Sequence, residues 1–267
     1  MAYPIVLAHG IARFDALFKD FPYWNGVPKI LSDKGYIVHQ TNIDWAGPVV
    51  KRAEELADQI ENLISKNGYE KVNIIGHSSG GLDARYAIAK NGLASKVASL
   101  TTLGTPHHGT PFADAAFENG VAQEIISLSR VFGEDMDGFK DLTSEECRKR
   151  NNELKEFEDK VQKPRFYRTY AGVQPIENIF WLLLLSYRVI KRREVEKGEP
   201  GDNDGLVPVE SAKWKDEYSK GIYNFDHLNL LGWWDSSESG LLGRGRTKAE
   251  FEKEISDFYL GLAGGLP

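Results

Sequence analysis

The chain is poor in several features that would place it in large classes of protein. Its 267 residues include one cysteine, Cys147, so that an intrachain disulfide and a thiolate metal cluster are both excluded. It has no excess of basic residues either, because the formal net charge is -6 and the pI is about 5.6. A nucleic-acid partner is therefore not expected, since such a partner requires a basic face that neutralises phosphates.

Long hydrophobic runs are also missing. The longest run, residues 179–185, is much shorter than the roughly 20 apolar residues that span a bilayer. Residues 1–8 lack the basic region and the long apolar run of a secretory signal. We expect a soluble chain without a transmembrane segment, compatible with a reducing cytoplasm, and a single domain over residues 1–267.

The apolar residues that are present form short runs that alternate with helical patterns. Continuous apolarity over strand-length runs is typical of strands buried on both faces, and the alternation of strand and helix predicts a parallel sheet. Apolar residues spaced by three and four precede Gly68, which we expect to end a helix. The strand-like segments are 5–8, 36–39, 72–75, 97–103 and 165–171, and the last predicted helix covers 247–262.

The alternation stops between residues 110 and 164. Helix-like segments rich in acidic residues, around 113–132 and 145–161, predict a helical lid or cap inserted over the sheet. A further segment, 175–193, has an acidic residue near its start and three basic residues at its end, which suits a helix dipole. We predict a helix of about four turns there, apolar on all sides over residues 179–185.

One serine lies in a distinctive setting between a predicted strand and a predicted helix. Gly76 and Gly80 bracket Ser78 in the pattern G-x-S-x-G, the nucleophile elbow, in which glycines allow a sharp turn to close around a strained central residue. On these five residues alone, a tight turn with a solvated serine is an equal alternative. The choice therefore depends on the rest of the chain.

A serine hydroxyl becomes a good nucleophile when a histidine takes its proton and a carboxylate orients that histidine. His227 follows a strand-like segment and a possible acid loop, whereas His107 and His108 follow a strand with no suitable carboxylate before them. The stretch 201–207 offers two aspartates, of which we favour Asp204 over Asp202. An ordinary Asp-Gly turn is a competing interpretation of Asp204.

The oxyanion of a tetrahedral intermediate needs backbone N–H donors. One donor is expected from Ser79, the residue after the nucleophile, and the other from Ile11, in the loop after the first strand. Gly10 would let that loop approach closely. We interpret His9 and His77, like the pair after the fourth strand, as structural residues that bond to backbone groups.

Five blocks of sequence, in order and suitably spaced, resemble one known family. Residues 3–10, 72–81, 100–110, 203–207 and 226–229 are similar to the blocks of the true bacterial lipases of the Pseudomonas, Burkholderia and Proteus type. The resemblance implies an α/β-hydrolase fold with a mostly parallel central sheet, helices on both faces and a helical lid insertion. It also implies these roles: Ser78 nucleophile, Asp204 acid, His227 base, and Ile11 and Ser79 oxyanion donors.

The activity implied by the resemblance is that of a triacylglycerol lipase, which hydrolyses long-chain acylglycerols through an acyl-enzyme at a lipid–water interface. A carboxylesterase for short soluble esters is an alternative, and a non-catalytic protein that binds an acyl ligand is a rival of another class. In the lipase interpretation, segment 175–193 lines the acyl pocket with Trp181 and Tyr187 near lipid and residues 191–193 near anionic head groups. A helix packed in the core is the alternative.

The sequence departs from this family at two places. Members commonly carry a cysteine shortly after the acid loop, where this chain has Pro208, so that their disulfide is missing. They also hold a structural calcium partly through an aspartate two residues after the catalytic histidine, where this chain has Asn229. We therefore predict no metal and no cofactor, although other oxygens could compensate. The family is often secreted, and localisation and oligomeric state stay open.

Overall fold

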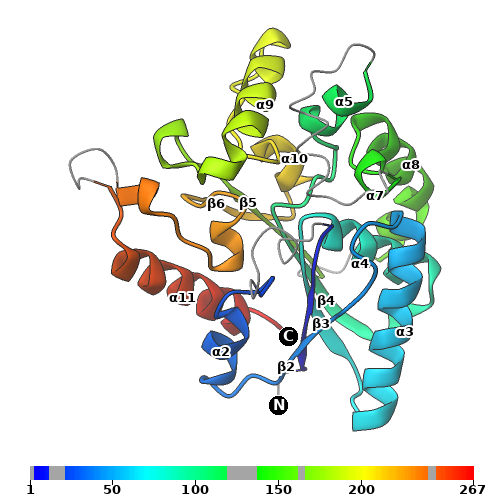
Figure 1. Cartoon of the computed structure of the whole chain (residues 1–267). Coiled ribbons are helices and arrows are strands. Elements are labelled where there is room, and N and C mark those ends of the chain that lie inside the picture. Colours follow the sequence, from blue (N-terminus) through cyan, green and yellow to red (C-terminus); the bar gives the residue numbers. More distant parts are fainter. Residues whose placement is uncertain (1–2, 12–21, 119–136, 162–165, 240–244) are drawn as a thin grey trace.

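The centre of the molecule is a six-stranded sheet with strand order β2-β1-β3-β4-β5-β6 (Figure 1). The computed structural model describes residues 3–11, 22–118, 137–161, 166–239 and 245–267. Each strand pairs in parallel with its neighbours, which confirms the predicted parallel sheet. The strands are β1 Ile5–Ala8, β2 Val38–Gln40, β3 Val72–His77, β4 Val97–Leu103, β5 Tyr167–Gly172 and β6 Ser219–Tyr223.

The continuous apolar runs arise because helices cover both faces of the sheet. Ile5 and Leu7 of β1 belong to the core on one face, and Val6 and Ala8 belong to the core on the other. Figure 1 shows α2 and α11 on the first face and α3 and α4 on the second. The bounds of these helices are α2 Val27–Ser32, α3 Val49–Asn67, α4 Ser79–Lys90 and α11 Lys248–Gly264.

Local signals set the ends of the two long helices. Helix α3 ends at Gly68, whose φ of 67° is a left-handed conformation that glycine adopts without strain. Helix α11 begins with a capping box in which Thr247 and Glu250 bond to each other's backbone N–H groups. Both ends agree with the sequence. The short helices α2 and α10 (Val209–Lys213) and the 3₁₀ turn Leu93–Ser95 carried no clear sequence signal.

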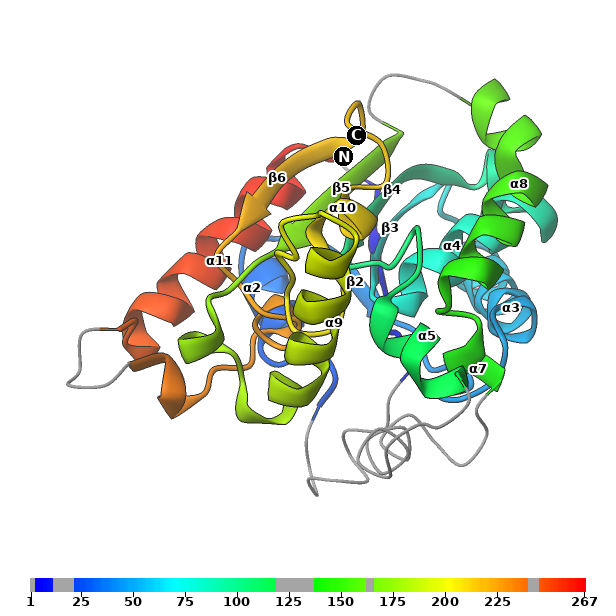
Figure 2. The same cartoon turned by 90° about the horizontal axis from the view of Figure 1, so that it is seen from above.

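The described parts of residues 110–161 contain helices that lie over the carboxyl ends of the strands and beside α4 (Figures 1 and 2). The predicted helix at 145–161 corresponds to α8, Ser144–Lys160. The helix predicted around 113–132 begins with α5, Pro111–Phe117, and residues 119–136 lie outside the described residues. A further short helix, α7, covers Asp137–Lys140.

The helix predicted over residues 175–193 is wrong in its first half. Residues Ile176–Asn178 and Trp181–Leu183 form separate 3₁₀ turns, and α9 begins at Leu184 and continues to Glu196. Between the two turns, Ile179 is extended, and the N–H of Phe180 donates to Asp226 Oδ2 at 2.8 Å. This long-range hydrogen bond replaces an intrahelical one, which explains why the apolar pattern does not give a continuous helix.

The side chains of this segment also depart from the lipid-surface interpretation. Trp181 is 55 % exposed, as that interpretation requires, but Tyr187 is buried in the core. All three basic residues pair within the protein, Lys191 with Asp202, Arg192 with Glu196, and Arg193 with Glu118 at the end of α5. None of the described helices is both long enough and apolar enough to cross a membrane.

Candidate active site

The turn between β3 and α4 holds Ser78 in a strained backbone conformation. Its φ of 54° and ψ of -132° are rare for a residue with a side chain, and such conformations cost about 1–3 kcal/mol. The turn is close-packed against the loop after β1: a Cβ on Gly10 would lie 2.9 Å from Ser78 Cβ, and one on Gly80 would lie 2.5 Å from the carbonyl oxygen of Ala8. The elbow therefore requires glycine at both positions.

Asp204 and His227 meet in the interior of the protein. Asp204 Oδ2 lies 2.8 Å from His227 Nδ1, and the two side chains are 1 % and 2 % exposed. Asp204 Oδ1 accepts from the N–H groups of Leu206 and Val207, and the His227 N–H donates to the carbonyl of Asp204 at 2.7 Å. The carboxylate thus fixes a tautomer in which Nδ1 carries the proton and Nε2 is the basic nitrogen.

The other candidates from the sequence lie away from this pair. Asp202 is 60 % exposed and its carboxylate is 3.5 Å from Lys191 Nζ. The ring of His107 is buried between Arg85 and Thr102, and His108 Nε2 bonds to the carbonyl of Trp214. These contacts support the choice of Asp204 and His227.

The two predicted oxyanion donors lie next to each other at the elbow. The N–H of Ile11 donates to Ser79 Oγ at 2.7 Å. The N–H of Ser79 belongs to the first turn of α4, where backbone N–H groups have no intrahelical acceptor. A substrate oxygen at this position would have to displace the Ser79 hydroxyl from the Ile11 N–H.

A buried arginine holds the loop that carries these donors. Arg52 of α3 donates to Asp83 Oδ2 through Nε and Nη2, at 3.0 and 2.7 Å, and Nη2 also donates to the carbonyl of His9 at 2.9 Å. Burial raises the pKa of Asp83 to about 6. Burial, together with the Arg52 charge, lowers the pKa of His9 to about 4, so that the imidazole is neutral.

A chain of hydrogen bonds crosses from this loop to the histidine. The N–H of Gly10 donates to the Tyr23 hydroxyl at 2.7 Å, which lies 2.7 Å from His77 Nδ1, and His77 Nε2 lies 3.1 Å from the carbonyl of His227. Burial lowers the pKa of His77 well below its usual range, which keeps the ring neutral. His77, expected to be structural, therefore connects the elbow with the histidine loop.

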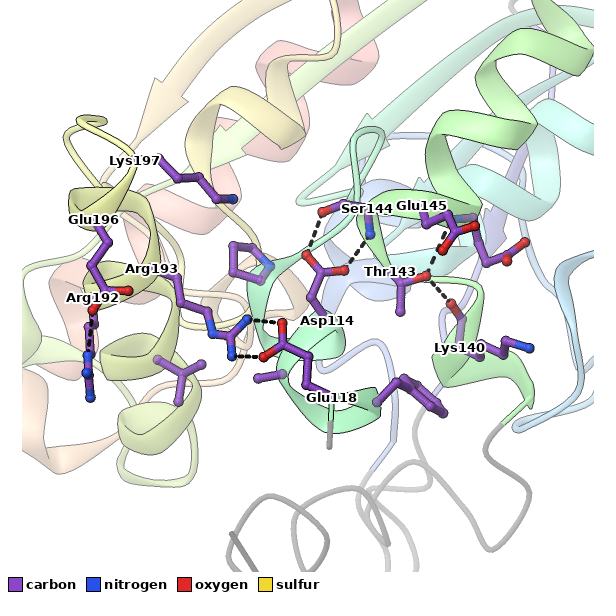
Figure 3. A pocket seen from close by; sticks show the side chains of 15 residues that line it. Asp114, Glu118, Lys140, Thr143, Ser144, Glu145, Arg192, Arg193, Glu196 and Lys197 are labelled. Carbon is purple, nitrogen blue, oxygen red and sulfur yellow. Dashed lines mark hydrogen bonds and ion pairs between the residues drawn. The ribbon is translucent and has the colours of Figure 1, made fainter. Parts of the chain in front are cut away.

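A large cleft lies elsewhere, between α5, α8 and α9 (Figure 3). Its volume is about 960 Å³, and Ser78, Asp204 and His227 do not line it. Charges of both signs line the cleft, including the bidentate pair of Glu118 and Arg193, with N–O distances of 2.6 Å. The cleft therefore does not contain the candidate catalytic residues.

Sequence reasoning missed the residues that fasten the site. Arg52, Asp83 and Tyr23 lie in separate segments of the sequence, and the local patterns around Asp83 and Tyr23 do not distinguish them from surface residues. A charged residue on the apolar face of a predicted helix, such as Arg52 among Val49, Ala53 and Leu56, is the one available signal.

Known proteins share the family of this chain. Residues 3–156, more than half of the chain, match the family described as alpha/beta hydrolase fold. Triacylglycerol lipase 2 of Saccharomyces cerevisiae is 31 % identical over 92 % of this chain and 74 % of its own length. The triacylglycerol lipase of Burkholderia plantarii is 40 % identical over 49 % of this chain and 39 % of its own length, so that this match spans less than half of either protein.

A solved structure supports the fold in particular. The mature lipase BlEst2 of Bacillus licheniformis has a TM-score of 0.68 and 20 % identity, covering 86 % of each chain. At that identity the likeness concerns the fold alone, and it agrees with the parallel sheet and its covering helices. The sequence matches show that the chain belongs to the α/β-hydrolase family and, within it, to the lipase family of the Saccharomyces and Burkholderia enzymes.

Proposed function

We propose that this chain is a serine-dependent carboxylic ester hydrolase, and specifically a triacylglycerol lipase that acts on long-chain acylglycerols. The observation that carries the proposal is the buried contact between Asp204 and His227, 2.8 Å long, beside the strained elbow of Ser78. The names of the relatives support the substrate class.

In the proposed mechanism, Ser78 Oγ attacks the ester carbonyl carbon while His227 Nε2 takes its proton. Asp204 stabilises the imidazolium that forms, and the N–H groups of Ile11 and Ser79 bind the oxyanion. The imidazolium then protonates the departing alcohol, which leaves an acyl-enzyme. His227 then deprotonates a water that attacks the acyl carbon, and the imidazolium returns this proton to Ser78 Oγ as the fatty acid is released.

We further propose that the chain is one hydrolase domain in which segments 110–164 and 175–193 form the cap. Helices α5 and α9 lie side by side over the strand ends in both views, and Glu118 and Arg193 join them (Figures 1 and 2). The exposed ring of Trp181, at the start of the second segment, supports contact between this cap and lipid.

Replacing the nucleophile tests the proposal. Ser78→Ala should lower ester hydrolysis to the residual level, a loss of at least about 10³-fold, while the melting temperature is kept, because the elbow depends on its glycine neighbours rather than on the hydroxyl. Wild-type turnover with Ser78→Ala would refute the mechanism. Binding of fatty acid without hydrolysis by the wild type would favour a non-catalytic acyl-binding protein.

The choice between lipase and carboxylesterase needs a second experiment. Trp181→Asp should lower hydrolysis of an emulsified long-chain triacylglycerol by at least about tenfold and leave a dissolved short ester almost unchanged, since a charge opposes transfer to the lipid surface. Ile222→Asp, at a residue 51 % exposed on the edge strand, is the matched control. Equal losses on both substrates would favour the carboxylesterase.

A further inference from the structure

The loop that carries His227 is built around a single arginine. Arg246 lies just before α11 and is 9 % exposed. Its Nε donates to Glu238 Oε2 at 3.0 Å, and its Nη1 donates to the carbonyl of Asn224 at 3.0 Å and to Glu254 at 2.9 Å. Its Nη2 donates to Asn229 Oδ1 at 2.9 Å and to Glu238.

These five hydrogen bonds use all five N–H donors of the guanidinium group. Two of them end on residues that flank His227, Asn224 three positions before it and Asn229 two positions after it. The guanidinium also lies over the rings of Phe225 and Phe251, at 5.4 and 4.8 Å from their centres. Arg246 therefore contacts the histidine loop at residues before and after His227 in the sequence.

The acceptors of this arginine are themselves held in place. Glu238 is fully buried, and its Oε1 accepts from Asn229 Nδ2 at 2.8 Å and from the N–H of Asp235 at 3.1 Å. Asn229 Oδ1 also accepts from the N–H of Asp226 and from Gln174 Nε2, each at 3.0 Å. Each of these acceptors thus has several donors, which a loose surface pair would not have.

A calcium ion, which the family resemblance implies near the histidine, does not fit here. Asn229 Oδ1, at the position of the expected carboxylate ligand, already accepts three hydrogen bonds, one of them from a cation. A guanidinium this close would repel a divalent ion. Among the described residues, no three His, Cys, Asp or Glu side chains are grouped so that they could hold a metal.

We propose that Arg246 is a positioning residue that replaces a structural metal: its guanidinium, anchored by Glu238, holds the His227 loop in the geometry needed for proton transfer. The inference rests on the proposed function, because it assigns His227 the role of the base. It predicts a lipase whose activity needs no calcium and whose turnover depends on a cation built into the chain.

The test compares kcat and KM for a dissolved short-chain ester. Arg246→Gln should lower kcat by roughly 10- to 100-fold, with KM changed less than about threefold, because misplacement of a catalytic group affects the chemical step rather than ground-state binding. Lys253→Gln is the matched control, since Lys253 is 78 % exposed and pairs with Asp257 within α11. It should leave kcat unchanged.

Two additions separate positioning from simple structural support. Guanidinium chloride at low millimolar concentration should restore part of the kcat of Arg246→Gln, whereas potassium chloride should not. Arg246→Lys, which keeps the charge but loses the planar fork, should fall between wild type and Arg246→Gln. If Arg246→Gln does not fold, Glu238→Gln, which removes the anchoring charge, should show the same loss of kcat at constant KM in a smaller degree.

A chelator tests independently whether the wild-type protein needs calcium. The wild-type kcat and melting temperature should be the same in EDTA and in millimolar calcium chloride. A fall of the wild-type kcat or melting temperature in EDTA would overturn the inference. So would a kcat within twofold of wild type in Arg246→Gln, or in Glu238→Gln if that variant is folded. Such a result with Ser78→Ala still inactive would leave the proposed function intact, whereas an active Ser78→Ala would remove the basis of both.

Discussion

The two halves of the candidate active site are each fastened by one arginine, in different ways. On the nucleophile side, Arg52 pairs with a buried carboxylate: Asp83 Oδ2 accepts from Arg52, and Asp83 Oδ1 has no hydrogen-bond partner within the described part of the chain. On the histidine side, Glu238 has Asn229 and Asp235 as donors besides Arg246. Among the described residues, the Asp83 carboxylate thus depends on Arg52 alone, whereas the Glu238 carboxylate accepts hydrogen bonds from several groups.

This difference explains how each half should respond to change. Removing Arg52 leaves a charge buried without compensation, whereas removing Arg246 leaves a carboxylate that still accepts two hydrogen bonds. Substitution of the arginine should therefore lower the free energy of unfolding most on the nucleophile side. On the histidine side it should mainly disturb the catalytic geometry. The following predictions test that contrast, from the largest expected effect to the smallest.

On the histidine side, the acid gives the largest effect. Asp204→Asn should lower kcat by about 10³- to 10⁴-fold, because the amide would favour the wrong imidazole tautomer. Asp202→Asn should stay within about twofold of wild type, since Asp202 lies at the surface beside Lys191. Both are measured with a soluble ester, and the reverse order would transfer the acid role to Asp202.

On the nucleophile side, Arg52→Met should lower the free energy of unfolding by about 3–5 kcal/mol, the usual cost of leaving one partner of a buried ion pair unpaired. Urea denaturation followed by tryptophan fluorescence measures the change. Arg246→Gln should cost less in the same assay. Equal costs would mean that the additional donors to Glu238 do not matter.

The halves should also respond oppositely to acid. The pKa of His9 is lowered from 6.5 to about 4 in the folded protein. The contribution of His9 to the free energy of unfolding is therefore fully present above pH 6.5 and is lost as the pH falls toward 4. At about 1.4 kcal/mol per pKa unit this amounts to about 3 kcal/mol. Burial instead raises the pKa of Asp226 to about 7. The contribution of Asp226 to the free energy of unfolding is therefore lost as the pH rises through 7.

His9→Gln provides the measurement for this contrast. Between pH 6.5 and 4, the free energy of unfolding of the variant should fall less than that of the wild type, by up to about 3 kcal/mol. Hydrogen exchange at both ends of that range, read separately for β1 and for residues 224–233, would show which half loosens. A fall of the same size in variant and wild type would refute the assignment to His9.

The same contrast explains what could be predicted from the sequence. The nucleophile side is local: the strand, the glycines and Ser78 follow one another, so the pattern predicted a strand at 72–75, the elbow and a helix after it, and the structure extends the strand to His77 and places α4 at Ser79–Lys90. The pairing of Asp204 with His227 could be predicted from the order of the residue types. Its support could not, because Phe180 and Arg246 reach this loop through contacts across 46 and 17 residues.

The failure at residues 175–183 has the same origin. Apolar periodicity reports how a segment would bury its side chains, but it does not register a buried carboxylate elsewhere that needs a backbone donor. Asp226 takes the N–H of Phe180, and the helix is interrupted there. Local pattern therefore predicted the elements well where their hydrogen bonds are internal, and poorly where a distant polar group competes for them.

One side chain at the opposite end of the sheet brings the two ends of the chain together. Asn73 Nδ2 lies 3.3 Å from the carbonyl oxygen of Tyr3 and 3.4 Å from that of Pro267, and Figure 1 shows the termini close to each other, away from the strand ends that bear the site. Residues 3 and 267 therefore lie close to each other in space. A short peptide joining these ends, with a new opening in the exposed turn at residues 197–199, would give a circular permutant. The candidate catalytic residues would then follow one another as acid, histidine and serine, an order that unrelated hydrolases use for the same geometry.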